Sequence, residues 1–182
     1  MKKTHPLYNN WSLLAISLLI INLIQAHFTL LLDDEAYYWM FSRHLDWGYF
    51  DHPPMVAFFI KIGYNLFQNE LGVRLLTVFS QVIMLRVIWQ MITIPNKENY
   101  TWAFFLTAFS LPMLQIYGFF TTPDVPLLLF GSLTLLAYQQ FKKVANFQHI
   151  LFFSLSAAAL MYSKYHGALF LIFIIASNRN NR

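Results

Sequence analysis

An apolar run from about Trp11 to Leu32 constrains the fold more than any other feature of the sequence. At about 1.5 Å of rise per residue, a helix of this length crosses a hydrocarbon core of roughly 30 Å. Five further apolar segments follow, at about residues 73–94, 102–119, 125–141, 149–162 and 167–177. The sequence therefore predicts an all-α membrane protein with about six transmembrane helices, organised as one transmembrane module over residues 1–182.

The composition favours lipid over water as the solvent of this chain. Apolar residues make up 58% of the sequence and charged residues 11%, whereas about a quarter of the residues of a soluble domain are charged. No cysteine is present, which excludes disulfide bonds, thiolate nucleophiles and cysteine-based metal sites. The formal charge of +4 is modest and gives no indication of a nucleic-acid partner.

The basic residues predict the orientation of the spans. If Lys2 and Lys3 lie inside, six spans also place Lys97, Lys142 and Lys143 inside, as the positive-inside rule requires. Seven of the eight acidic residues then lie outside.

The last two apolar segments are short, so one long helix from His149 to Ser177 is an alternative to two spans. We expect two short helices that meet at Lys164, because a lysine at the centre of a bilayer is costly.

Residues 33–72 form the first outer loop, which is too long and too apolar for a simple connector. Asp33 or Asp34 can cap a short helix that ends near Leu45. Pro53 and Pro54 can open a second helix. We expect both helices to lie at the membrane interface. The apolar positions expected on the second helix are Met55, Phe59, Ile62 and Leu66.

Three adjacent carboxylates, Asp33, Asp34 and Glu35, lie at the boundary between the first span and this loop. Such a cluster can be a solvated helix cap. It can also supply a general base, which needs a carboxylate within hydrogen-bond reach of an acceptor hydroxyl, or oxygen ligands for a divalent cation. The sequence alone leaves these alternatives open.

Other outer segments carry further candidates. Asp51 and His52 precede the two prolines, Asp124 lies between the third and fourth spans, and Lys164 lies at the expected break. Each has a structural alternative: a turn, a helix cap, or a lysine that extends to the interface. Together with Asp34 they converge on one membrane face, where carboxylates and cations suit a reaction on a lipid-linked phosphate.

Four motifs occur in an order that resembles a known family. They are DEAYY at 34–38, YFDHPP at 49–54, TPDVP at 122–126 and SKYHG at 163–167. The family comprises polytopic GT-C-type glycosyltransferases that use polyprenyl-phosphate sugars, and includes the dolichyl-phosphate-mannose protein mannosyltransferases and the aminoarabinose transferases of lipid A. The resemblance runs from Trp11 to about Ser177.

The resemblance implies roles for individual residues. Asp34 resembles the family's catalytic base, Glu35 completes the acidic pair, and Asp124 resembles the acid of the second outer loop. His52 occupies a position where the aminoarabinose transferases carry a lysine that meets the donor phosphate, and Lys164 would lie near the same phosphate. A divalent metal ion held by Asp34 and Asp124 is a further expectation.

The implied reaction is an inverting transfer of a sugar from a polyprenyl phosphate to a hydroxyl acceptor, such as lipid A, a protein or a glycan. The expected location is the bacterial inner membrane, with the site facing outward. Family members are several times longer, so we expect this chain to act with a C-terminal part or a partner chain. The alternatives are a lipid-linked-sugar transporter and a non-catalytic membrane scaffold.

Overall fold

The computed structural model describes residues 10–179, and these residues form helices and connections without any strand. The α-helices are α1 (Asn10–Phe28), α2 (Asp33–Arg43), α3 (Met55–Leu66), α4 (Glu70–Met91), α5 (Thr101–Ser110), α6 (Pro112–Phe119), α7 (Asp124–Lys143), α8 (Phe147–Ser163) and α9 (Gly167–Arg179). A short 3₁₀ helix, η2 (Lys97–Tyr100), precedes α5. The predicted all-α architecture is confirmed.

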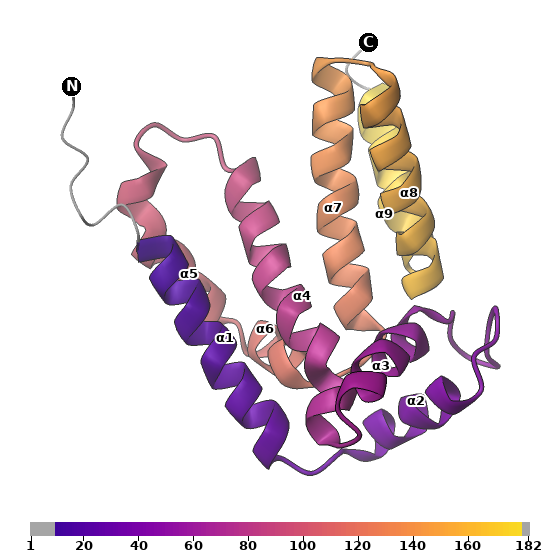
Figure 1. Cartoon of the computed structure of the whole chain (residues 1–182). Coiled ribbons are helices and arrows are strands. Elements are labelled where there is room, and N and C mark those ends of the chain that lie inside the picture. Colours follow the sequence, from indigo (N-terminus) through magenta and orange to yellow (C-terminus); the bar gives the residue numbers. More distant parts are fainter. Residues whose placement is uncertain (1–9, 180–182) are drawn as a thin grey trace.

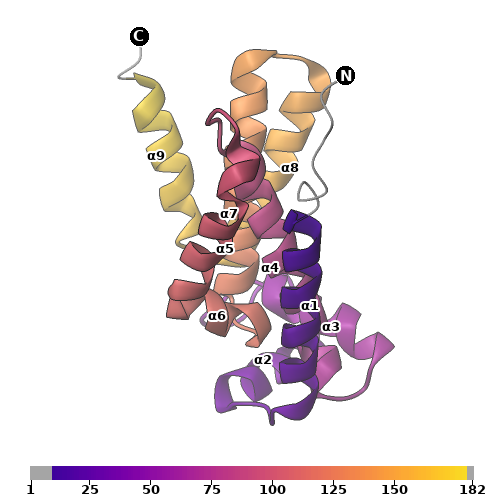
Figure 2. The same cartoon turned by 90° about the vertical axis from the view of Figure 1, so that its left-hand side faces the viewer.

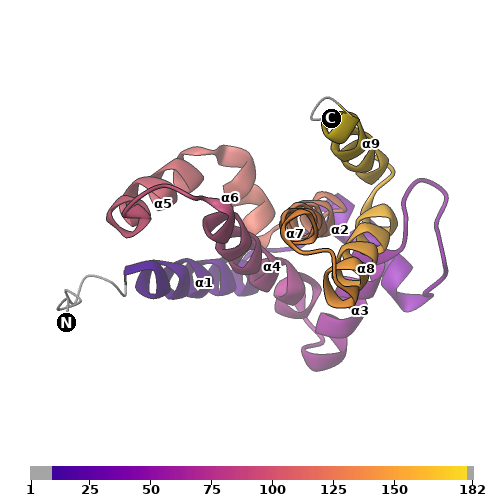
Figure 3. The same cartoon turned by 90° about the horizontal axis from the view of Figure 1, so that it is seen from above.

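The longer helices run side by side, and α2 and α3 lie across one end of them (Figure 1). Seen from above, α4 and α7 occupy the centre, with α1, α5 and α6 on one side and α8 and α9 on the other (Figure 3). The end of α9 lies far from α2 and α3 (Figure 2). The connections α1–α2, α6–α7 and α8–α9 share the α2/α3 end, so the candidate residues on them are brought to one end of the bundle.

The hydrophobic core surrounds α4, which packs against α1, α3, α6 and α7. One cluster of buried residues joins α1, α3, α4, α5 and α7 and includes Leu18, Met84 and Phe105. A second cluster, with Tyr38 and Ile60, fills the space under α2 and α3. The packing therefore fixes the α2/α3 end against the rest of the bundle.

Within residues 10–179, two helices, α1 and α4, are long and apolar enough to cross a membrane, and the pair α5 and α6 would be a third span if it counts as one. These helices agree with a membrane protein. The number of spans, their orientation and the single-module organisation over residues 1–182 stay predictions. Lys2, Lys3 and Arg182, which contribute to the orientation argument, lie outside the described residues.

The span predicted at 102–119 is not one continuous helix. It is divided at Leu111 into α5 and α6, which are bent by 82°. Pro112 causes the break because it has no N–H to donate to the preceding turn. The side chain of Gln115 replaces that donor and bonds the carbonyl oxygen of Ala108 at 3.3 Å. The break expected at Lys164 is present, since α8 ends at Ser163 and α9 begins at Gly167.

One local prediction for the first loop was wrong. The N-cap of α2 is Leu32 rather than Asp33 or Asp34, because Glu35 accepts the backbone N–H of Leu32 at 3.2 Å. On α3, the apolar side chains of Ile62 and Leu66 are exposed, and their contact with the membrane interface stays a prediction. The face of α3 that is buried in the protein comprises Val56, Ala57, Phe59, Ile60 and Gly63, which pack toward α2 and α4.

The close approach of α3 and α4 requires glycine at two positions, one on each helix. A Cβ atom at Gly72 would lie 1.7 Å from the carbonyl oxygen of Phe67, and one at Gly63 would lie 2.2 Å from the carbonyl oxygen of Gly72. Both neighbours are backbone atoms, which cannot rotate away as a side chain can.

We predict that Gly72→Ala destabilises the fold by about 1–3 kcal/mol, the usual cost of overpacking. Gly48→Ala is the matched control, because a Cβ there meets nothing within 4 Å. The measurement is the thermal unfolding of both variants in detergent. Equal melting temperatures would contradict the close approach of α3 and α4.

Candidate functional site

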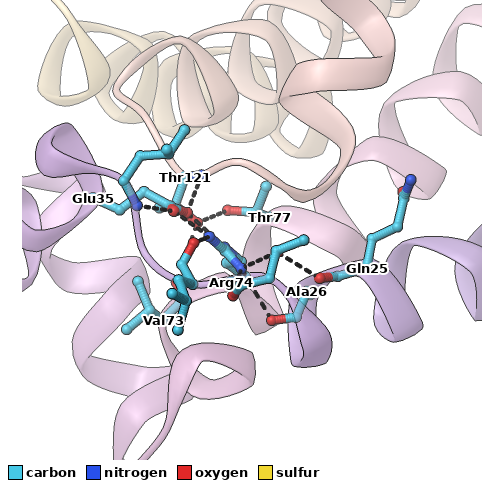
Figure 4. A network of polar contacts seen from close by, with 10 residues as sticks. Gln25, Ala26, Glu35, Val73, Arg74, Thr77 and Thr121 are labelled. Atoms are coloured by element: carbon cyan, nitrogen blue, oxygen red, sulfur yellow. Dashed lines mark hydrogen bonds and ion pairs between the residues drawn. The ribbon is translucent and has the colours of Figure 1, made fainter.

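A buried ion pair between Arg74 and Glu35 lies under the α2/α3 end (Figure 4). Their side chains are 1% and 0% exposed. The Nε of Arg74 donates to Oε1 of Glu35 at 2.7 Å, and Nη2 donates to Oε2. The remaining guanidinium protons bond the carbonyl oxygens of Ala26, Thr29 and Leu30 at 2.7–3.2 Å. Arg74 thus satisfies carbonyls that the end of α1 leaves without helical partners.

Glu35 connects this pair to the segment between α6 and α7. Its Oε1 accepts the backbone N–H of Thr121 at 3.0 Å. The hydroxyl of Thr121 donates to the carbonyl of Val73 at 3.2 Å and therefore accepts the hydroxyl proton of Thr77, 2.6 Å away. One carboxylate therefore joins the start of α2, the first turns of α4 and the α6–α7 connection.

Asp34 differs from its neighbour Glu35 in burial and in hydrogen bonding. Successive residues of an α-helix point about 100° apart, so Glu35 faces the core while Asp34 is exposed. Among residues 10–179, the carboxylate of Asp34 makes no hydrogen bond or ion pair. Its carboxylate oxygens are therefore accessible to a ligand, while its backbone is held by the pair at Glu35.

Tyr38 lies one helical turn after Asp34, on the same face of α2. Its hydroxyl lies 3.2 Å from Nε2 of His52. Burial raises the pKa of Tyr38 to about 12, and the negative charges of Asp34, Asp51 and Asp124 act in the same direction. Three carboxylates from three separate segments therefore act on the pKa of one phenol.

The segment before α3 brings Asp51 and His52 to the same group. One oxygen of Asp51 lies 3.5 Å from Nε2 of His52, and the other accepts the hydroxyl of Tyr37 at 3.1 Å. Burial raises the pKa of Tyr37, and its hydrogen bond to Asp51 adds to the effect. His52 thus contacts both Tyr38 and Asp51 and is placed beside α2.

Asp124 and Lys164 form the second polar pair at this end. The Nζ of Lys164 bonds Oδ1 of Asp124 at 2.8 Å, with side chains 23% and 27% exposed. Asp124 lies in the first turn of α7, where the helix dipole favours a carboxylate. Because both side chains are partly exposed, a ligand can reach the ammonium group of Lys164.

The described residues contain no group of three or more His, Cys, Asp or Glu side chains arranged to hold a metal ion. Asp34 and Asp124 supply carboxylates, but Lys164 already occupies one oxygen of Asp124. These two residues therefore do not make a formed cation site, and metal binding by them stays a prediction.

Arg74, the central residue of the site, was not among the residues predicted from the sequence. Its signal was a cation near the start of an apolar span, close in the topology to three acids. Tyr38 and Thr121 were also missed. The spacing of Tyr38 from Asp34, one helical turn, indicated a shared face, whereas nothing in the sequence indicated that Thr121 would bond Glu35.

Residues 51–182 match the family described as dolichyl-phosphate-mannose-protein mannosyltransferase. The chain belongs to this family. His52, Asp124 and Lys164 lie inside the matched range, and Asp34 and Glu35 lie before it.

A second comparison finds a lipid A galacturonosyltransferase, RgtD, from Rhizobium johnstonii, which is 32% identical over 111 residues. The match covers 58% of this chain and 23% of that protein, so this chain spans less than a quarter of the relative's length. No solved structure matches the chain. Together with the apolar helices, the comparisons make this chain a membrane protein of a glycosyltransferase family.

We predict that Glu35→Gln and Arg74→Gln each destabilise the fold by about 3–5 kcal/mol, because each leaves an unpaired buried charge. The double variant leaves no unpaired charge, so its loss should be much smaller than the sum. Unfolding of the three variants gives the coupling free energy. Arg43→Gln is the control, because Arg43 is exposed at the same end. Additive losses would contradict the pairing.

Proposed function

We propose that this chain carries the base and the phosphate-binding residues of a glycosyltransferase that moves a sugar from a polyprenyl phosphate to a hydroxyl acceptor. The observation that carries the proposal is the contrast between two adjacent carboxylates. Glu35 is buried and neutralised by Arg74, whereas Asp34 is exposed and, in the described part of the chain, unpaired, on a backbone that the same pair holds in place. The family and the relative RgtD support the reaction class.

In the proposed reaction, Asp34 accepts the proton of the acceptor hydroxyl while the hydroxyl oxygen attacks the anomeric carbon. The bond between that carbon and the phosphate oxygen breaks, and the polyprenyl phosphate leaves with the bonding electrons. A single displacement inverts the anomeric centre. The leaving phosphate is already an anion, so the main requirement on the protein is to stabilise its additional charge.

Lys164 and His52 are the proposed partners of that phosphate. The ammonium group of Lys164 has three donors and uses one of them on Asp124, which leaves others for a phosphate. His52 can donate when protonated, and its contacts with Tyr38 and Asp51 hold its ring beside α2. We assign Asp124 the role of orienting Lys164, and Glu35 that of fixing Asp34 through Arg74.

An apolar cavity suits the lipid part of the donor. It has a volume of about 560 Å³ and lies between α7 and α9, with Leu135, Phe170 and Phe173 among its lining residues. Its wall includes His166, two residues after Lys164. A prenyl chain in this cavity would keep its phosphate near Lys164.

The proposed membrane is the inner membrane of a bacterium, crossed by about six spans, with the α2/α3 end outside. Lipid A, a protein hydroxyl or a glycan is the proposed acceptor, and the transferred group is a hexosyl or pentosyl unit. Because the match covers 23% of RgtD, we propose that a C-terminal part or a partner chain completes the enclosure of donor and acceptor.

Asp34→Asn should lower transfer at least about 100-fold, the usual contribution of a general base, and leave the melting temperature unchanged. The assay follows sugar transfer from a radiolabelled polyprenyl-phosphate donor in membranes that contain the complete enzyme. Asp33→Asn is the matched control, since Asp33 is the adjacent exposed carboxylate. Retained turnover in Asp34→Asn would exclude Asp34 as the base.

Lys164→Gln should raise the KM for the donor on the order of tenfold, because a hydrogen bond to a charged group contributes about 1.5–3 kcal/mol. Lys164→Arg should recover much of the affinity, since it keeps the charge. Lys61→Gln, on α3, is the control. If Lys164→Gln has the same KM for the donor as the unchanged protein, Lys164 does not bind the donor phosphate.

A further inference from the structure

A side-chain amide in the middle of α4 connects three helices. Gln81 lies near the midpoint of α4 and is 5% exposed. Its Nε2 donates to the carbonyl oxygen of Leu114 in α6 at 2.5 Å. Its Oε1 accepts a hydrogen bond from Nδ2 of Asn22 in α1, which is 1% exposed. The amide clamp, defined as Asn22, Gln81 and the carbonyl of Leu114, therefore joins α1, α4 and α6.

The clamp lies among apolar side chains, where an unpartnered amide is costly. A Cβ atom at Gly118 would lie 2.5 Å from Nε2 of Gln81. Helix α6 can approach the amide this closely only because residue 118 has no side chain. Gly118 and the carbonyl of Leu114, both on α6, therefore meet the same amide group.

This contact matters because α6 is the part of a broken helix that follows the 82° bend at Leu111. Across the bend, the N–H of Leu111 bonds the carbonyl of Ala108 at 3.4 Å, and the side chain of Gln115 bonds the same carbonyl at 3.3 Å. Both are long hydrogen bonds to one atom, and neither fixes the direction of α6. The bond from Gln81 holds α6 from a neighbouring helix.

The position of α6 determines where the next residues of the site lie. Helix α6 ends at Phe119, Thr121 bonds Glu35, and Asp124 bonds Lys164. We propose that Gln81 is a positioning residue: by holding α6 at its bend, it places Thr121 beside Glu35 and Asp124 beside Lys164. An effect of Gln81 on sugar transfer rests on the function proposed above, whereas its effect on the positions of Thr121 and Asp124 does not.

The space around the clamp excludes a binding role for the amide itself. The cavity lined by Gln81, Leu114 and Tyr117 has a volume of about 10 Å³, which is room for about one water molecule. A transported sugar or lipid headgroup does not fit there. The side chains of Asn22 and Gln81 are bonded to one another and join helices instead.

The absence of cysteine from the chain permits a direct test. The hydroxyl oxygens of Thr77 and Thr121 lie 2.6 Å apart, so Thr77→Cys and Thr121→Cys place two sulfur atoms within disulfide reach. The rate of disulfide formation under mild oxidation, in membranes that contain the full chain, reports how often residue 121 lies against α4.

In this background Gln81→Leu should slow disulfide formation about tenfold, as expected for the loss of a buried hydrogen bond. Gly118→Ala should slow it comparably, because its Cβ displaces the amide while Gln81 remains. Gln90→Leu is the matched control, an exposed glutamine on the same helix, and should leave the rate unchanged. All variants are compared below their measured melting temperatures.

If Gln81→Leu fails to fold, Gly118→Ala decides the test alone. Unchanged rates in the folded variants would overturn the proposal. A third variant, Asn22→Leu, removes only the α1 side of the clamp and should slow the reaction less than Gln81→Leu does. The disulfide assay needs no sugar transfer, so slow cross-linking together with retained turnover in Asp34→Asn would keep the clamp and reject the catalytic base.

Discussion

The arrangement of the site depends on the buried ion pair between Arg74 and Glu35. An isolated charge in this environment would be very costly, and a pair is tolerated only when its remaining donors and acceptors are bonded. Those bonds come from the carbonyls at the end of α1, the N–H of Leu32 and the N–H of Thr121. The need to satisfy one guanidinium and one carboxylate therefore sets the relative positions of four separate segments.

The same ion pair gives two neighbouring acids different environments. Glu35 is neutralised and enclosed, which suits a residue that holds the backbone of α2 in place. Asp34 lies about 100° round the helix, is exposed, and has no hydrogen-bond or ion-pair partner within residues 10–179, which suits the proposed role of a general base. Lys164 combines pairing and exposure in one side chain. Its ion pair with Asp124 orients the ammonium group, which stays partly exposed.

Polar groups inside the bundle follow a different rule from those at its α2/α3 end. Within apolar helices every backbone donor and acceptor needs a partner from the protein, and Pro112 removes one donor from the broken helix α5–α6. Gln115 supplies a replacement, and Gln81 bonds α6 from the neighbouring helix. The amide of Gln81 is enclosed with almost no free space, whereas the candidate catalytic groups Asp34, His52 and Lys164 remain accessible to solvent or ligand.

The sequence by itself determined the helical class, the break at Lys164 and the gathering of Asp34, His52, Asp124 and Lys164 at one end. These follow from local chemistry: apolar runs of membrane length, the cost of a lysine between apolar segments, and the placement of polar residues in the connections. Only the tertiary structure decided that Arg74 neutralises Glu35, that Lys164 pairs with Asp124 and that the carbonyl of Leu114 in α6 meets Gln81. Each of these depends on contacts between segments far apart in the sequence, and the pattern of residues along one helix carries no information about which distant partner a buried charge or amide will find.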